Sequence, residues 1–218
     1  MIYFFDICDT LYKSNTTFDF IDFYFKRQRR LVKRIFLQGI RSRRSPLFFL
    51  LAIAGRVYGV DLHKRIAIKL LRGEHKERLE VMAERFYEEV LRNTAIKTTR
   101  GLLDEARSRE DRVILLSATI DPVAKIIADK LACSYICSGL EYVDDKATGK
   151  IVFDLAGMKE TIVRRHFGDI EYAVVTDNFS DFELVKGAQI RFVVVYNKKS
   201  EEHWKTLNPA LIKPNEIM

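Results

Sequence analysis

Aspartate residues follow two short apolar runs, which places carboxylates where two predicted strands end. Asp6 comes directly after the run 1–5, and Asp177 comes two residues after the run 172–175. Asp181 lies one helical turn beyond Asp177, so both carboxylates can face the same point. Carboxylate oxygens are ligands that Mg²⁺ takes together with the oxygens of a phosphate substrate. Asp6, Asp177 and Asp181 therefore indicate a magnesium site for phosphoryl chemistry.

Two further side chains can serve a phosphate group at the same place. Ser117 follows a third apolar run, 113–116, and its hydroxyl can donate a hydrogen bond to a phosphoryl oxygen. Lys159 precedes the strand that leads to Asp177, and its ammonium can neutralise negative charge. Taken singly, each residue has a local alternative, such as a turn, a helix cap or a solvated charge. The agreement of three strand ends with one lysine favours a common site.

Strands must alternate with helices to bring these residues together. The runs 1–5, 113–116, 172–175 and 192–196 are short and apolar, as expected of strands buried on both faces. Helical segments separate several of them, for example at 158–167. This alternation predicts an α/β fold, with a Rossmann-like, mostly parallel sheet and helices on both faces. Ligands of such sheets bind beyond the carboxyl ends of the strands, where the candidate residues lie.

A long helical stretch, 16–109, comes between the first strand and the others. It is predicted to be an insertion, an all-helical cap over the sheet. The expected division is an α/β core of residues 1–12 and 100–218, with a helical cap of residues 13–99.

Local signals set some of the expected boundaries. Thr16 and Asp19 have the spacing of a capping box, which predicts a helix that begins at Thr16. Ser180 is predicted to cap a helix in the C-terminal part of the chain. The segment 142–153 is expected to form a β-hairpin, with Asp144, Asp145 and Gly149 in its turn region.

Positive charge is concentrated in one part of the predicted cap. The chain carries 37 Lys and Arg and 30 Asp and Glu, a formal net charge of +7. From residue 23 to residue 60 there is no acidic residue and there are ten basic ones: Lys26, Arg27, Arg29, Arg30, Lys33, Arg34, Arg41, Arg43, Arg44 and Arg56. The rest of the chain has 27 basic and 30 acidic residues, a balance of −3. The positive charge therefore belongs to this segment.

An apolar run of eight residues, 47–54, follows most of these basic residues. It is too short to span a bilayer, which needs about 20 residues. Two interpretations remain open, a cap helix buried in protein and an interfacial segment beside basic residues. The basic residues themselves fit a solvated face over a packed core, an anionic membrane surface or nucleic acid. Nucleic acid is disfavoured, because the nearby aromatic residues lie on the apolar stripe rather than among the charges.

Composition and cysteine usage bound the class of protein. Hydrophobic residues make up 48% and charged residues 31%, which is ordinary for a globular protein and excludes disordered, collagen-like and porin-like chains. The three cysteines are an odd number, and the start of the chain is an apolar strand followed by carboxylates rather than a signal peptide. We therefore expect a cytoplasmic protein, either free or peripheral on the inner face of the membrane.

Four short motifs resemble those of the haloacid dehalogenase-like hydrolases. They occur in the family's order: Asp6-Ile-Cys-Asp-Thr10-Leu11, then Leu115-Leu-Ser117-Ala, then Lys159, then Thr176-Asp177-Asn-Phe-Ser-Asp181. The segment 117–150 is similar to the phosphoserine-phosphatase-like branch of that family. Motif order and spacing cover most of residues 1–12 and 110–198.

The resemblance implies a role for each matching residue. Asp6 would be the nucleophile that accepts a phosphoryl group, giving an aspartyl-phosphate that water then hydrolyses. The implied cofactor is Mg²⁺, held by Asp6, the backbone carbonyl of Cys8, Asp177 and Asp181. Ser117 and Lys159 would bind the oxygens of the transferring phosphoryl group.

Cys8 departs from the family pattern. Thr10 sets the register, so Cys8 occupies the position where the family has a second aspartate as general acid and base. A thiol of ordinary pKa protonates an alkoxide less well than a carboxylic acid does. Asp9 is adjacent but is expected to point elsewhere. The open outcomes are a slow phosphatase, a substrate whose leaving group needs no protonation, and a site that binds without turnover, while Cys8 can also be a small buried filler.

These observations predict a Mg²⁺-dependent phosphomonoester hydrolase. Its expected partners are a phosphorylated small-molecule or lipid substrate and an anionic membrane surface, since the cap loosely resembles that of a phosphatidylglycerophosphate phosphatase. The alternative is a non-catalytic or weakly active member of the same fold that binds phosphate or membranes, because Cys8 replaces the usual general acid.

Overall fold

A central sheet organises the computed structural model, which describes residues 1–214. Within those residues the strand order is β4-β3-β2-β1-β5-β6-β7, and neighbouring strands run parallel except β3 and β4, which are antiparallel. The strands are β1 (Ile2–Phe5), β2 (Arg112–Ile120), β3 (Ser134–Val143), β4 (Lys146–Phe153), β5 (Tyr172–Thr176), β6 (Ile190–Val194) and β7 (Ala210–Ile212). The predicted α/β fold with a mostly parallel sheet is confirmed.

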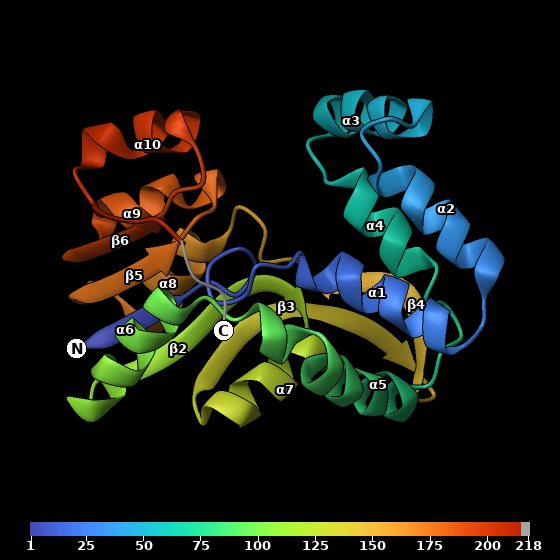
Figure 1. Ribbon diagram of the computed structural model, residues 1–218, viewed down its shortest axis with the longest axis horizontal. Coiled ribbons are helices and arrows are strands. Elements are labelled where there is room, and N and C mark those ends of the chain that lie inside the picture. The colour runs from blue at the N-terminus through green and yellow to red at the C-terminus, as the bar shows by residue number, and fades with distance from the viewer. Residues whose placement is uncertain (215–218) are drawn as a thin grey trace.

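Helices cover both faces of this sheet (Figure 1). They are α1 (Thr16–Arg27), α2 (Leu31–Arg41), α3 (Pro46–Tyr58), α4 (Leu62–Lys69), α5 (Lys76–Glu89), α6 (Lys97–Ser108), α7 (Asp121–Leu131), α8 (Lys159–Phe167), α9 (Phe182–Gly187) and α10 (Lys198–Trp204). Side chains of a strand alternate between faces, and in β1 Tyr3 and Phe5 join one buried cluster while Phe4 joins the other. The first cluster includes α1 and α5–α7, and the second includes α8–α10. Burial on both faces explains why the strands are continuous apolar runs.

Helices α1–α5 lie between β1 and β2 in the chain, where the sequence predicts an insertion. In Figure 1, α2, α3 and α4 lie together at one end of the molecule, away from β5 and β6. Helices α1 and α5 pack against α7, which covers the sheet. The division at residues 13–99 stays a prediction. Helix α6, which begins near its boundary, packs on β2.

The connection between α4 and α5 is hydrogen-bonded to the β3–β4 hairpin. Gly73 donates its N–H to the carbonyl of Ala147 at 2.8 Å, and Ala147 donates to the carbonyl of Glu74 at 2.9 Å. Gly149 has φ +83°, and a Cβ there would lie 3.1 Å from the Cα of Lys69, so glycine is required for this close approach. The inserted helices are thereby attached to the edge of the sheet through β4.

Two predicted helix caps are wrong. The helix predicted to begin with a Thr16 cap is capped by Asn15, whose side chain accepts from the N–H of Phe18, while Asp19 bonds Ser14 instead of closing a capping box. Likewise Asn178 rather than Ser180 caps the turn Phe179–Asp181, accepting from the N–H of Ser180 at 3.0 Å. In both cases an asparagine upstream competes for the same N–H groups.

Several strand boundaries also differ from expectation. The hairpin is present and its turn is Asp144–Asp145, as predicted, but Gly149 lies within β4 rather than in the turn. The last predicted strand, 192–196, is displaced, since β6 spans Ile190–Val194. Strand β7 was not expected from the sequence, because an edge strand of three residues is too short to carry a pattern.

In residues 1–214 no single helix is long and apolar enough to cross a membrane. Helices α3 and α4 reach the length and composition of a span only when taken together, and they are bent by 112° at the break between them.

Candidate active site

The predicted nucleophile, Asp6, lies at the carboxyl end of β1, between β2 and β5 in the sheet. Its N–H donates to the carbonyl of Val175 at 2.9 Å, which continues the parallel ladder by one residue. The Asp6 side chain is 5% exposed, and its Oδ1 accepts from the N–H of Ile7 at 2.7 Å. This bond fixes the orientation of the carboxylate and leaves Oδ2 for contacts with other side chains.

Asp177 follows β5 and is tied to the β1 loop. The hydroxyl of Thr10 donates to Asp177 Oδ1 at 2.9 Å. Burial, together with the charge of Asp6, raises the pKa of Asp177 to about 8. The fold thus holds this carboxyl group beside another carboxylate, where Lys159 only partly offsets the shift, as expected where a cation binds.

Asp181 is buried in the turn Phe179–Asp181 that follows Asp177. Its Oδ2 accepts from the hydroxyl of Thr176 at 2.6 Å. Its Oδ1 has no hydrogen-bond partner among the residues that the structure describes. Burial raises the pKa of this carboxyl group, although Lys159 opposes the shift. One oxygen of Asp181 is therefore available to a ligand.

Lys159, the first residue of α8, joins two of these carboxylates. Its Nζ donates to Asp6 Oδ2 at 2.6 Å and to Asp181 Oδ2 at 2.7 Å, and its side chain is 2% exposed. Burial disfavours the ammonium charge, but Asp6 and Asp181 outweigh it, so the pKa of Lys159 lies above its ordinary value. The sequence placed Lys159 near the carboxylates, and the structure brings the three side chains into direct contact.

Ser117 lies in β2, next to β1, with its side chain buried. Its Oγ is 3.1 Å from the hydroxyl of Thr119, and it accepts from the N–H of Thr119 at 3.3 Å. Among the described residues it makes no hydrogen bond to Asp6 or Lys159. The predicted phosphate contact of Ser117 stays a prediction.

The thiol of Cys8 lies in a cluster of hydroxyl groups. Cys8 Sγ is 2.9 Å from the Thr16 hydroxyl and 3.4 Å from that of Thr119, and the two hydroxyls are 2.7 Å apart. Burial, with a contribution from Asp6, raises the pKa of Cys8 to about 11. The group is therefore a neutral thiol near pH 7, and it is a weaker proton donor than the carboxylic acid of the family pattern.

Asp9, next to Cys8, has a left-handed backbone with φ 47°. Its carbonyl oxygen accepts from the Tyr196 hydroxyl at 2.6 Å, which ties this loop to the region after β6. Burial raises the pKa of Asp9, and the negative charges of Asp19 and Asp6 raise it further. Asp9 makes no side-chain hydrogen bond to Cys8 or Asp6 in residues 1–214.

The donor set fits Mg²⁺ better than a metal that needs several protein ligands. Over residues 1–214 no group of three or more His, Cys, Asp or Glu side chains is arranged around one metal position. Mg²⁺ commonly takes one or two carboxylates and completes its shell with water and substrate phosphate. The unpartnered Oδ1 of Asp181 and the raised pKa of Asp177 are consistent with such a partial shell.

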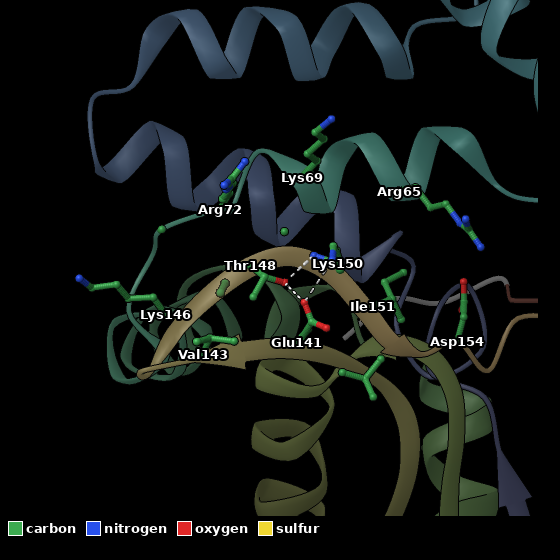
Figure 2. Close-up of a pocket in the computed structure, with 14 residues that line it drawn as sticks. Arg65, Lys69, Arg72, Glu141, Val143, Lys146, Thr148, Lys150, Ile151 and Asp154 are labelled. Atoms are coloured by element: carbon green, nitrogen blue, oxygen red, sulfur yellow. Dashed lines mark hydrogen bonds and ion pairs between the residues drawn. The ribbon is translucent and has the colours of Figure 1, made fainter.

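A cavity of about 1050 Å³ lies elsewhere, between α4 and the β3–β4 hairpin. Figure 2 shows basic side chains of α4 above those of β4. Five basic residues line it: Arg65, Lys69, Arg72, Lys146 and Lys150. Glu141 accepts from Thr148 in its wall, and Asp154 is paired with Lys64. None of the candidate catalytic residues lines this cavity. The candidate active site is therefore assigned from the types and contacts of its side chains and not from the volume of a cavity.

Four threonines contact candidate site residues, and the sequence had assigned none of them to the site. Thr10 holds Asp177, Thr176 holds Asp181, and Thr16 and Thr119 surround the Cys8 thiol. Thr10 lies inside the first motif and contacts Asp177 of the fourth, whereas Thr176 lies inside the fourth motif, five positions from Asp181, which it contacts. Position within a motif was therefore a usable signal for these two. Thr16 carried no such signal, because its contact joins the first inserted helix to β2.

The sequence matches a family model described as haloacid dehalogenase-like hydrolase over residues 3–186. No match was found among curated proteins.

Solved structures with the same fold include several phosphatases. A protein with unknown function from Bordetella pertussis Tohama I has TM-score 0.73 and 17% identity, with 97% of each chain covered. A substrate-bound phosphoserine phosphatase has TM-score 0.62 and 18% identity, covering 98% of this chain and 93% of that one. A probable phosphoserine phosphatase from Vibrio cholerae has TM-score 0.63 and 13% identity, and the match covers 98% of this chain and 60% of that one. At these identities the likeness shows the fold, which is shared with the phosphoserine-phosphatase-like branch.

Proposed function

The chain belongs to the haloacid dehalogenase-like hydrolases, and we propose that it hydrolyses phosphomonoesters in a Mg²⁺-dependent reaction through an aspartyl-phosphate on Asp6. The observation that carries this proposal is the contact of Asp6, Lys159 and Asp181 at the end of β1. A buried carboxylate beside a buried ammonium supplies both a nucleophile and a charge for the transferring group.

In the proposed first step, a carboxylate oxygen of Asp6 attacks phosphorus while the bond to the ester oxygen breaks. The Ile7 N–H holds Oδ1, so the orientation of the attacking group is fixed before substrate binds. Lys159 lies 2.6 Å from Oδ2, within reach of oxygens of a phosphoryl group joined to Asp6. In the second step water attacks the same phosphorus and releases inorganic phosphate, which restores the Asp6 carboxylate.

Mg²⁺ would be held by Asp6, the backbone carbonyl of Cys8 and Asp177, with Asp181 bound directly or through water. When bound, it supplies positive charge for the phosphoryl oxygens. Thr10 and Thr176 orient Asp177 and Asp181 for this task. Ser117 is proposed to donate to a phosphoryl oxygen by rotating its hydroxyl away from Thr119.

Protonation of the leaving oxygen decides between an active phosphatase and a weakly active or non-catalytic protein. The Cys8 thiol, with a pKa of about 11, donates a proton to an alkoxide only slowly. The preferred substrates are therefore esters whose leaving group is a stable anion. The second candidate function, a weakly active or non-catalytic phosphate-binding protein, is favoured by the same observation.

The proposed substrate is an anionic phosphate ester, either a soluble small molecule or one linked to a lipid. The basic segment from residue 23 to residue 60 supports an anionic partner. The proposed location is the cytoplasm, where the protein is either free or bound peripherally to the inner face of the membrane. A release assay over soluble and amphiphilic phosphomonoesters with Mg²⁺ ranks these substrates.

The central test is phosphate release from an aryl phosphate in the presence and absence of Mg²⁺. We expect turnover with Mg²⁺ only, and a loss of at least about a thousandfold in Asp6→Asn. Asp129→Asn is the matched control, because Asp129 is an exposed residue of α7 paired with Lys125, and this variant should retain full activity. Full activity of Asp6→Asn would remove Asp6 as the nucleophile, and no release by the wild-type protein would favour the non-catalytic alternative.

A further inference from the structure

Large apolar side chains are exposed on two adjacent helices of the inserted segment. Val32 on α2 is 82% exposed, and Leu50 and Val57 on α3 are 64% and 76% exposed. We call these residues the α2–α3 apolar face: Leu31, Val32, Ile35, Phe36, Phe49, Leu50, Ile53, Val57 and Tyr58. Isolated exposed apolar residues are common, but this many on two packed helices mark a surface that another phase or molecule covers.

The basic residues of the same segment divide into two groups. Five make ion pairs within the protein: Arg27 with Glu89, Arg30 and Lys33 with Glu74, Arg34 with Asp22, and Arg41 with Asp19. The others are exposed and make no ion pair within residues 1–214: Lys26, Arg29, Arg43, Arg44 and Arg56. The second group carries positive charge that no acidic residue of the described chain neutralises. It lies in the last turn of α1, in α3 and in the segments that join α1, α2 and α3.

Helix α4 is held by the protein rather than free to enter a bilayer. Lys64 on α4 is 6% exposed, and its Nζ donates to Asp154 at 2.6 Å and to Ser138 at 3.2 Å. The break after α3 turns the chain by 112°. Helix α3 can therefore lie along a surface while α4 stays packed on β4, an arrangement that does not cross the membrane.

We propose that the α2–α3 apolar face docks on the surface of an anionic lipid bilayer, with α3 in the plane of the interface. Burial of the apolar side chains supplies binding energy, and the unpaired arginines contact acidic headgroups. Charge chooses this occupant over a second copy of the chain, because two copies facing each other would place like charges together. The bilayer would be a partner of the proposed phosphatase, so the role of docking rests on the proposed function. The binding itself needs no substrate.

Helix α1 connects this surface with the site. Thr16 at its start contacts the Cys8 thiol, and its end leads directly into α2. A bilayer bound at α2 and α3 is thus one helix away from the candidate active site.

Co-sedimentation of the full chain with vesicles tests the proposal. We expect binding to vesicles of phosphatidylcholine with about one third phosphatidylglycerol, and much weaker binding to phosphatidylcholine alone. Binding should fall as salt is raised to about 0.5 M.

Two variants separate the contributions, each with a matched control. Phe49→Ser/Leu50→Ser/Ile53→Ser should weaken binding more than about 100-fold, whereas Val81→Ser/Val143→Ser, at exposed valines of α5 and β3, should not change it. Arg43→Gln/Arg44→Gln should weaken binding about 30-fold, from about 1 kcal/mol per charge. The same loss of charge in Arg107→Gln/Arg165→Gln, on α6 and α8, should have little effect.

Specific outcomes would overturn the proposal. Equal binding by the α3 variant and its control would remove the apolar face from the contact. A concentration-dependent dimer without vesicles, abolished by the α3 variant, would assign the face to a second copy. Binding that resists extraction at high pH would indicate a spanning segment. Turnover of a soluble aryl phosphate is measured on the same variants, so failure of docking and failure of the proposed function are distinguished.

Discussion

At the carboxyl ends of β1 and β5, charged side chains are buried and paired: Asp6, Lys159 and Asp181 are each at most 5% exposed, and Lys159 donates to both carboxylates. On α2 and α3 the arrangement is reversed, since apolar side chains such as Val32 and Val57 are in solvent. Burial of charge costs free energy unless the charges are paired, and exposure of apolar surface costs free energy unless a partner covers it. In the first region the buried charges are paired by other side chains of the same chain. In the second region the apolar side chains are left for a partner outside the chain to cover.

The largest effect on stability is expected from Lys159→Met, which leaves Asp6 and Asp181 buried without their counter-charge. Loss of one partner of a buried ion pair lowers the free energy of unfolding by about 3–5 kcal/mol. Lys125→Met, which breaks the exposed pair with Asp129 on α7, should change it by at most about 1 kcal/mol. Urea denaturation of the two variants measures the difference. Equal effects would show that the buried charges are no more dependent on one another than surface charges are.

A smaller effect, on turnover, is expected from Cys8→Asp, which places a carboxyl group at the proposed general-acid position. Turnover of an alkyl phosphate should rise about 100-fold, since the leaving alkoxide requires a proton. Turnover of an aryl phosphate should rise much less, because its leaving anion is stable. Cys8→Ser is the control and should not reproduce the gain. An unchanged ratio of the two substrates would show that Cys8 does not occupy the proton-donor position.

The smallest effect is expected on the pH dependence of stability. The pKa of Asp177 is raised from 3.8 to about 8, so between these values the folded protein binds a proton that the unfolded chain has released. Stability of the metal-free protein should therefore fall as pH rises, and between pH 6 and pH 8 Tm should drop by about 5 °C. Asp177→Asn should flatten this slope, and Mg²⁺ should raise Tm most at the higher pH. A Tm that rises with pH over this range would contradict the part-buried, proton-binding state of Asp177.

The sequence predicted the fold class and the residues at the strand ends because both depend on local pattern. Apolar runs bounded by polar residues identify β1, β2 and β5, and the motif order identifies Asp6 and Asp177. The bridge from Lys159 to Asp6 and Asp181 could not be read locally, because it depends on how α8 packs against the sheet. The two wrong caps show the limit of local reading as well, since Asn15 and Asn178 compete with the residues chosen.

The apolar run 47–54 shows why solvent exposure is harder to predict than helix formation. Its residues form α3, as the pattern requires, but Phe49, Leu50 and Ile53 are exposed, so a helix fully buried in the protein is not what the chain forms. Periodicity cannot report this, because α3 is apolar on nearly every side and only its packing on α2 and α4 selects the covered face.

The bonds that join the α4–α5 connection to β4 bear on how this chain can be recombined with its relatives. Gly73, Glu74 and Lys76 pair with backbone of the β3–β4 hairpin, and Lys64 reaches Asp154 beyond it. A chimaera that exchanges only the inserted helices would separate these partners and leave Gly149 facing an unmatched helix. The modular unit is therefore discontinuous in the chain, consisting of α1–α5 together with the hairpin some 50 residues later, and both segments must be inherited together.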